Sequence, residues 1–289
     1  MNDFYNLVAH RASCRAYCPE PIPEEVFRRV LEAGCKAPSA GGFQNYSIIR
    51  VKDPEARKAL TKVCRGQQFI TAAPECLVLC VDYHRMDQTR EIEPAPFQET
   101  DQFENFVMGI ADVMIAAQTM VLAAESEHLG SCYIGNVLNA MDRVTELLRL
   151  PERVFPVILL TFGWPKSPRK QPPKYSPDLL VHEDYYQERT PEQVYAAYRQ
   201  HNRWQKFTAS EKQLEKCCAT AELLHGAEYA ERVRQDIEQK GWMGSYQYWL
   251  GCYYLYQQLP NHMTNGEYLQ YFKQHGFRWL ESEYEEDTV

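Results

Sequence analysis

The segment from Phe103 to Asn136 constrains the fold more than any other part of the chain. Its first part carries apolar residues on every face, mostly Ala, Met, Leu and Ile, and predicts a long helix. Such a helix is buried in a large core, between chains or in a membrane. Asp112 interrupts the stretch, and a carboxylate near the middle of a membrane span costs about 3 kcal/mol. We therefore expect the helix to be buried in protein.

The residues that follow predict a change of structure. Gly130 is typical of a helix stop, the next residues predict a short buried strand from Cys132 to Ile134, and Gly135 breaks that strand. We expect the turn after the strand to bring bare backbone to a ligand.

Charge and cysteine spacing exclude several classes of protein. A net charge of -8 over 289 residues leaves no broad basic field, which argues against a nucleic-acid or anionic-membrane partner. The N-terminus carries an acid and no long apolar run, so we expect no secretory signal and a cytoplasmic protein. The ten cysteines show no C-x-x-C pair or zinc-finger spacing, so we expect free thiols and no metal site.

Strands and helices alternate over roughly the first 165 residues, which predicts an α/β or α+β sandwich. The run at 75–82 is apolar throughout, as in a strand of a sheet covered on both faces. Pro94 and Pro96 in a polar stretch predict a loop over 86–99. The other expected elements are strands at 46–51 and 154–162 and helices at 3–10, 23–36, 54–66 and 141–150.

The composition changes after residue 165. Residues 166–178 are rich in Lys and Pro and should be extended. Thr190-Pro191-Glu192-Gln193 is a capping box that starts a helix, and the chain stays polar and helical from there. We expect a helical extension packed on the first domain, with a disordered acidic end over 281–289.

Two segments have the chemistry of a binding site, each with an ordinary alternative. Arg11, Ser13 and Arg15 can converge on a phosphate, or form a solvated basic turn. The small residues of 37–42 let backbone approach a flat ligand, or simply end a helix. Glycine-rich nucleotide loops and a nucleophile elbow are absent from the sequence.

Taken together and in order, these segments resemble the FMN-dependent nitroreductase family, within it the long-tailed NADPH-nitroreductase and flavin-reductase branch. The resemblance rests on residues 11–25, 37–51, 66–82, 123–136 and 150–165, and residues 268–279 look like the C-terminal helix of that branch.

The resemblance implies an α+β fold, with a mixed sheet flanked by helices and a long central helix in the interface of a homodimer. Two FMN sites would lie at that interface, each built from both chains. An FMN-binding domain would cover 1–187 and a helical extension 188–289.

The resemblance also assigns cofactor contacts by position. Arg11, Ala12, Ser13 and Arg15 match the N-terminal FMN motif; Pro38, Ser39, Ala40, Gly41 and Gln44 match the segment given by the partner chain; Gln67 matches a flavin-edge residue; Ile134, Gly135 and Asn136 match the turn against the ring; and Lys174 matches a phosphate ligand.

Three positions depart from the family pattern. Ala12 stands where a basic residue is usual, and Pro172-Pro173-Lys174 replaces Lys-Pro-Arg. Either one or two basic phosphate contacts are lost, or Arg169 or Lys170 replaces them. Asn136 stands where glycine is common.

The implied activity is hydride transfer from NAD(P)H through FMN to nitroaromatic, quinone or flavin acceptors by a ping-pong mechanism. The cofactor carries the chemistry, so no catalytic side chain is expected. Two alternatives remain open. One is a flavin enzyme of this fold that performs reductive dehalogenation or dehydrogenation; the other is a flavin-binding dimer without efficient turnover.

Overall fold

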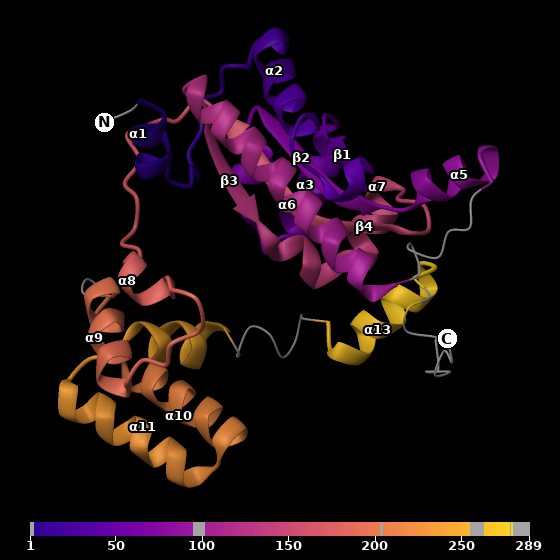
Figure 1. Cartoon of the computed structure of the whole chain (residues 1–289). Coiled ribbons are helices and arrows are strands. Elements are labelled where there is room, and N and C mark those ends of the chain that lie inside the picture. The colour runs from indigo at the N-terminus through magenta and orange to yellow at the C-terminus, as the bar shows by residue number, and fades with distance from the viewer. Residues whose placement is uncertain (1–2, 95–101, 203–204, 255–262, 278, 280–289) are drawn as a thin grey trace. The chain divides into compact units, whose positions relative to one another are not determined.

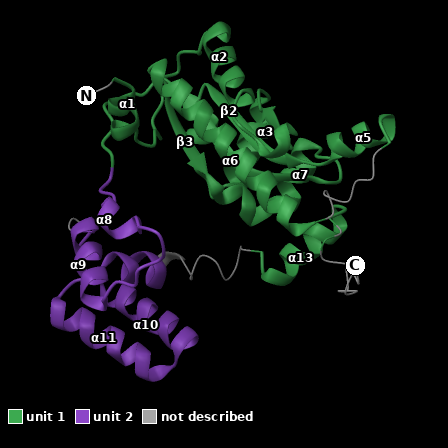
Figure 2. Cartoon of the chain, in the orientation of Figure 1, with its two compact units in different colours: residues 1–171, 263–289 green, residues 172–262 purple. Residues whose placement is uncertain are grey.

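The computed structural model describes residues 3–94, 102–202, 205–254, 263–277 and 279 (Figure 1). The chain forms two compact units (Figure 2). Unit 1 contains Met1–Gln171 and Met263–Val289, and unit 2 contains Pro172–His262. These limits differ from the predicted boundary between 187 and 188. Unit 2 begins earlier, at Pro172, and the C-terminal segment from Met263 returns to unit 1. The division into an FMN-binding domain and an extension stays a prediction.

Unit 1 is built on a four-stranded sheet. Its strands are β1 (Tyr46–Arg50), β2 (Glu75–Asp82), β3 (Gly130–Ile134) and β4 (Val154–Gly163), in the order β1-β2-β4-β3. All three neighbouring pairs are antiparallel, so within the described residues the sheet is not the mixed sheet that was predicted. The α+β class itself is confirmed.

The apolar run at 75–82 forms strand β2, in which every residue is buried. Successive side chains of a strand point to opposite faces of the sheet. Leu77, Leu79 and Val81 enter one hydrophobic core, while Cys76, Val78 and Cys80 enter a second core on the other face. Both faces are therefore covered, as predicted.

Helices cover both faces of the sheet (Figure 1). One core contains residues of α2 (Glu24–Cys35), α6 (Phe103–Ser126) and α13 (Asn265–Gln274), and the other contains residues of α3 (Pro54–Val63) and α7 (Met141–Leu148). The shorter elements of unit 1 are α1 (Asp3–His10), η1 (Ala40–Gly42), α4 (Phe69–Ala72), α5 (His84–Ile92) and η3 (Gly135–Ala140).

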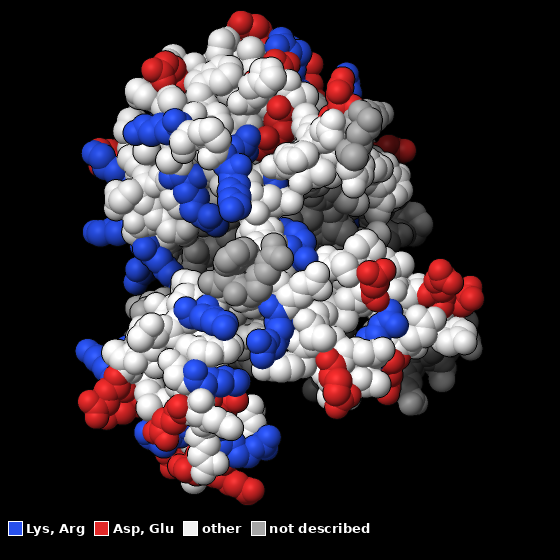
Figure 3. All heavy atoms as spheres, turned by 90° about the vertical axis from the view of Figure 1, so that its left-hand side faces the viewer, with Lys and Arg blue, Asp and Glu red and all other residues white. Residues whose placement is uncertain are grey.

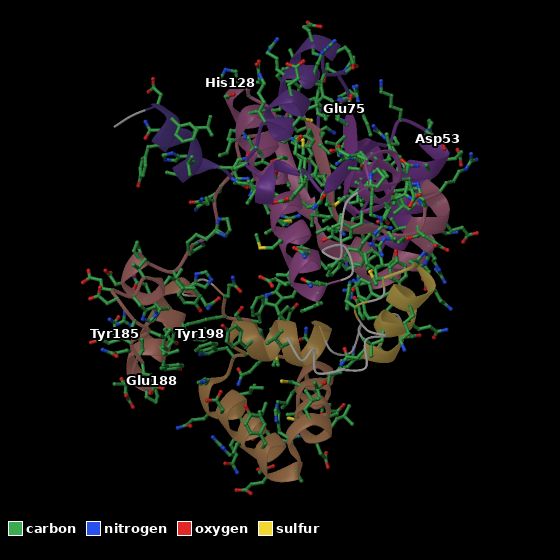
Figure 4. The ribbon with its side chains drawn as sticks, turned by 45° about the vertical axis from the view of Figure 1, so that its right-hand side comes forward. Asp53, Glu75, His128, Tyr185, Glu188 and Tyr198 are labelled. Carbon is green, nitrogen blue, oxygen red and sulfur yellow. The ribbon has the colours of Figure 1, made fainter. Side chains whose placement is uncertain are left out.

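Helix α3 begins where the sequence predicted. The carboxylate of Asp53 accepts a hydrogen bond of 2.8 Å from the backbone N–H of Ala56, and this N-cap lies at the edge of unit 1 in Figure 4. The predicted loop over 86–99 was wrong in its first half, because α5 extends to Ile92. The side chain of Asp82 accepts from the backbone N–H of Arg85 in its first turn, and Arg153 pairs with Asp87 at 2.5 Å. Residues 95–101 lie outside the described part.

The prediction that Gly130 stops the central helix was also wrong. The helix ends at Ser126, and His128 takes the left-handed conformation with φ 61°. Gly130 is instead the first residue of β3. A Cβ there would lie 2.6 Å from Cβ of Cys14, so glycine lets the N-terminal segment approach the strand.

Helix α6 is long and apolar enough to cross a membrane by length and composition. It packs in unit 1, where its buried face includes Val113, Ala117 and Val121 against the sheet and α2. Its other face remains apolar and exposed at Val107, Met108, Met114 and Ile115.

The C-terminal helix α13 is tied to unit 1 by aromatic contacts. Phe272 stacks on Phe155 with ring centroids 5.1 Å apart, and Phe106 meets both rings edge-on. Tyr271 donates or accepts a 2.7 Å hydrogen bond with the hydroxyl of Thr145. The chain therefore closes the core of unit 1 with residues that follow unit 2 in sequence.

Unit 2 is helical. It contains α8 (Pro177–Leu180), α9 (Pro191–His201), α10 (Glu211–His225), α11 (Ala227–Lys240) and the π-helical η4 (Gln247–Tyr254). The predicted capping box is present, because Thr190 and Gln193 satisfy each other's backbone N–H groups at the start of α9. A small core of Cys217, Ile237, Met243 and Cys252 holds the unit together.

We predict that Gly163→Ala lowers the free energy of unfolding by about 1–3 kcal/mol, because overpacking forces rigid neighbours to move. A Cβ at Gly163 would lie 2.5 Å from Pro74 Cδ and 2.8 Å from Tyr17 Cδ1. Urea unfolding measures the loss. The control is Gly266→Ala in α13, where the nearest atom lies 3.9 Å away. Equal stability of the two variants would contradict the prediction.

Candidate functional site

The N-terminal segment lies beside β3. The backbone N–H of Cys14 donates to the carbonyl of Ser131 at 2.8 Å, and the hydroxyl of Tyr17 donates to the carbonyl of Cys14 at 2.8 Å. These bonds fix the backbone between Arg11 and Arg15 along the strand. Figure 3 shows Lys and Arg side chains gathered on the face of unit 1 that lies on the α1 side of Figure 1.

Arg11 is half-buried and incompletely bonded. Its Nη2 lies 3.5 Å from the hydroxyl of Ser131, and its guanidinium carbon lies 5.5 Å from the centre of the Tyr133 ring. Its Nε is buried without a hydrogen-bond partner among the described residues. An unpaired buried donor is costly, so this arrangement suits a ligand that brings an acceptor.

The thiol and phenol beside this segment are not poised for catalysis. Burial raises the pKa of Cys132, although Arg15 and Arg11 oppose the shift. Burial also raises the pKa of Tyr133 to about 12. Both groups are therefore protonated at neutral pH.

Arg169 supports this segment instead of offering a free charge. It forms two hydrogen bonds to the carboxylate of Glu125, at 2.6 and 2.8 Å, and a third of 2.9 Å to the carbonyl of Ala12. The bonds to Glu125 raise the pKa of Arg169. Of the two residues expected to replace the missing basic contacts, Arg169 is thus held in an ion pair, and Lys170 is exposed.

Two predicted residues from distant parts of the sequence meet after β3. The amide of Gln67 donates to Asn136 Oδ1 at 2.9 Å and to the carbonyl of Cys64 at 3.0 Å. Ile134 is buried, whereas Gly135 is exposed and a Cβ on it would have no atom within 4 Å. The turn therefore presents bare backbone, with an amide side chain fixed beside it.

The second predicted group surrounds η1. Gly41 and Gly42 have φ of 57° and 73°, a conformation that favours glycine. The backbone N–H of Ala40 donates to Asp112 Oδ1 of α6 at 2.9 Å, and that of Gln44 donates to Ser39 Oγ at 3.3 Å. Pro38 and Gly41 are exposed. The segment is thus a preformed exposed loop anchored on the central helix.

The two groups lie at opposite edges of the sheet. Arg11, Ser13 and the Ile134–Asn136 turn lie along β3, whereas the η1 loop leads into β1. Three strand spacings separate the edges, about 14 Å. Within one chain the structure therefore does not bring the groups together. Lys174 is exposed and belongs to unit 2.

Asp112 and Tyr83 also lie in the candidate region, although no sequence pattern indicated them. They line a cavity of about 190 Å³ with residues of η1, α5 and α6. Asp112 Oδ2 and the hydroxyl of Tyr83 are buried without a hydrogen-bond partner among the described residues. Burial raises the pKa of Asp112, while its bond from Ala40 opposes the shift. From the sequence, Asp112 was only an interruption in an apolar helix.

The comparisons with known proteins agree with this architecture. Residues 8–164 match the model of the nitroreductase family. The oxygen-insensitive NADPH nitroreductase of Salmonella typhimurium is 34% identical over 63% of this chain and 73% of that protein. The FMN reductase [NAD(P)H] of Bacillus subtilis is 28% identical over 83% of this chain and 98% of that protein. The structure of nitroreductase A from Vibrio parahaemolyticus superposes with a TM-score of 0.67, at 30% identity over 83% of this chain and 98% of that one.

The fold and these relatives define an α+β oxidoreductase. The chain belongs to the nitroreductase family. The predicted family, fold class and enzyme class are thereby confirmed. The individual cofactor contacts remain predictions.

We predict that Asp112→Asn gains stability relative to the wild type as pH rises through the acid range. The pKa of Asp112 is higher in the folded state than its ordinary value of 3.8, so ionisation at rising pH costs the wild type folding free energy. The asparagine keeps an acceptor for the N–H of Ala40 and carries no charge. Urea unfolding from about pH 4 to about pH 7 measures the difference.

The control for this series is Asp53→Asn, which replaces an exposed N-cap by a residue that caps equally well. It leaves Asp112 in place and should therefore not reproduce the gain. A difference between Asp112→Asn and wild type that is constant over the whole series would contradict the assignment to Asp112.

Proposed function

We propose that this protein is a cytoplasmic FMN-dependent enzyme that passes a hydride from NAD(P)H to a small-molecule acceptor, such as a nitroaromatic, a quinone or a free flavin. The observation that carries the proposal is the grouping along β3. There, the unpaired Nε of Arg11 lies close to a strand that ends in the bare turn at Gly135. A phosphate needs the first of these features and a flat ring needs the second.

The side chains present fit FMN. Arg11 and Ser13 would hold the phosphate and the sugar chain, and Gln67, fixed by Asn136, would bond the polar edge of the ring. The bare backbone at Gly135 would lie against the ring without obstruction. Arg15 adds positive charge, which favours negative charge on the ring edge. FMN, when bound, accepts the hydride and passes two electrons to the acceptor.

The relatives support the choice of substrates. Their names include an NADPH nitroreductase, an NADPH-flavin oxidoreductase of Vibrio harveyi that is 35% identical over 65% of this chain, and a CR(VI) reductase of Pseudomonas. A solved Vibrio harveyi NADPH:FMN oxidoreductase, complexed with NAD+, is 29% identical over 81% of this chain with a TM-score of 0.66. Both nicotinamide donors are therefore candidates here.

We propose a homodimer as the active form. The η1 loop and the β3 group lie at opposite edges of one sheet, so a second copy would have to supply Pro38, Ser39, Ala40, Gly41 and Gln44 to each site. The exposed apolar face of α6 is the surface such a copy would cover. Both substrates would use the same face of the ring, which gives a ping-pong mechanism.

The decisive experiment starts from purified protein with its visible spectrum. We expect flavin absorbance that is bleached anaerobically by NADPH or NADH and restored by a nitroaromatic or quinone. Double-reciprocal plots at several acceptor concentrations should be parallel; intersecting lines would contradict ping-pong transfer. A colourless protein that takes up no FMN would overturn the proposal, and a bleached protein that no acceptor reoxidises would favour the flavin-binding dimer without turnover.

Arg11→Gln should weaken FMN binding about tenfold, because one charge-assisted contact to phosphate is lost. Titration of apoprotein with FMN, followed by quenching of flavin fluorescence, measures the change. The control is Arg28→Gln, an exposed arginine of α2 paired with Glu32. If both variants bind FMN like the wild type, Arg11 is not a phosphate ligand.

Met114→Glu should dissociate the dimer and release FMN, because a charge would be buried in an apolar interface. Met114 is 37% exposed in the single chain. Sedimentation velocity and the flavin content of the purified protein measure the outcome. Leu223→Glu, on an exposed apolar position of α10 in unit 2, is the control. A Met114→Glu variant that stays dimeric would refute the role of α6.

A further inference from the structure

Unit 2 contains a large cavity of its own. Its volume is about 890 Å³, which lies in the range of small-molecule sites. All its lining residues fall between Tyr175 and Gln247, inside unit 2, and none is a predicted flavin contact. The cavity is therefore built without any of the residues assigned to the flavin.

Helix α9 builds one wall. Pro191, Val194, Tyr195, Tyr198 and Asn202 line the cavity at the spacing of one helix face. Tyr198 of this wall lies 4.8 Å from Tyr246 between ring centres, and Figure 4 labels its position. The capping box at Thr190 fixes where the helix starts and therefore which side chains share this face.

The cavity is aromatic. Tyr175, Tyr195, Tyr198, Trp242 and Tyr246 all line it. A flat ring stacks favourably on such side chains, because aromatic pairs attract each other beyond the area that they bury. An aliphatic ligand would not use this surface in the same way.

The cavity is also basic. Arg189, Arg199, Lys206 and Lys240 are its charged lining residues, and no carboxylate lines it within the described part. The ammonium of Lys206 lies 4.9 Å from the centre of the Trp242 ring, and that of Lys240 lies 5.6 Å from it. Asp236 neutralises Lys240 at 2.6 Å, so the other three cations define the net charge.

Several polar groups of the lining are already satisfied from within unit 2. Gln205 accepts from the hydroxyl of Ser245 at 2.6 Å, Gln247 accepts from the N–H of Gly244 at 2.8 Å, and Asn202 donates to the carbonyl of Tyr198 at 3.0 Å. In contrast, Arg189 Nε is buried without a hydrogen-bond partner among the described residues. Arg189 Nη2, however, already donates to the carbonyl of Asp178 at 2.8 Å. The rings, Arg199 and Lys206 are therefore the main groups left to bind a ligand.

We propose that this cavity is a second binding site, for a flat aromatic anion. The ring would stack among Tyr195, Tyr198 and Trp242, and the acidic group would pair with Arg199 and Lys206. An anion also balances positive charge that is held over aromatic faces in a partly dry space. The site does not depend on the proposed flavin chemistry, since its residues all belong to unit 2.

The test uses the full-length protein as purified, with its flavin content unchanged. The probe is 8-anilinonaphthalene-1-sulfonate, and the matched neutral probe is N-phenyl-1-naphthylamine, which has the same rings without the sulfonate. We expect saturable fluorescence enhancement by the sulfonate probe that weakens as salt rises. Arg199→Gln and Lys206→Gln should each weaken its binding about tenfold, and should leave the neutral probe unaffected.

The control variant is Arg232→Gln. Arg232 lies 5.5 Å from the ring of Tyr229, much as Arg199 lies 5.9 Å from that of Tyr195, but it does not line the cavity. Equal probe binding in Arg199→Gln, Lys206→Gln and Arg232→Gln would overturn the proposal, because the probe would then lie elsewhere. Val194→Trp fills the cavity without a change of charge and should abolish sulfonate binding while the flavin absorbance stays unchanged.

Competition distinguishes the natural sources of such an anion. Salicylate tests aromatic carboxylates, and AMP tests nucleotides. Displacement of the probe by either supports the proposal and names the class. If neither displaces it at millimolar concentration, the assignment to an aromatic anion of the cell is wrong. A protein that binds the probe as expected but lacks flavin would refute only the proposed function, so the two failures are distinguishable.

Discussion

The close packing of α6 against the sheet is the contact on which the rest of unit 1 depends. Small residues make it possible. A Cβ at Gly109 would lie 3.1 Å from atoms of Val81 and Tyr83, and Ala116, Ala117 and Ala124 are fully buried. Burial of apolar area at about 25 cal/mol per Å² stabilises this close approach. A Cβ at Gly109 would require these neighbours to move by a few tenths of an ångström.

The same packing sets the two halves of the candidate site. Asp112 holds the backbone of the η1 loop at one edge of the sheet through Ala40. The end of the helix leads through the turn at His128 into β3, which carries the N-terminal segment at the other edge. The groups that the proposed cofactor needs together thus lie at opposite edges of one sheet, and for this reason we propose that a second copy of the chain completes each site.

Unit 2 differs from unit 1 in having a much smaller hydrophobic core. Its polar helices, rich in tyrosine, bury only a small core around Cys217 and Met243, and they enclose a cavity lined by rings and cations. If the cavity binds an aromatic anion, unit 2 adds a second binding site to the nitroreductase fold.

The sequence predicted elements well where local chemistry and burial agree. The alternating cores of β2, the cap at Asp53 and the capping box at Thr190 all follow from residue type and spacing, since each depends on neighbours within a few residues. It failed at Gly130, because glycine is needed there by a close approach of Cys14 from a distant segment.

The candidate site likewise combines local patterns, which the sequence predicts, with long-range contacts, which only the tertiary structure shows. The sequence by itself determined the family through the order of several local motifs. It also predicted the β3 turn and the arginines of the N-terminal segment as cofactor contacts, because each is a local pattern. Only the tertiary structure decided that Gln67 bonds Asn136, that Arg169 is held by Glu125, and that Asp112 is buried against η1. These contacts join residues about 40 to 70 positions apart, and a side chain's partner at that separation depends on how the strands pair and the helices pack.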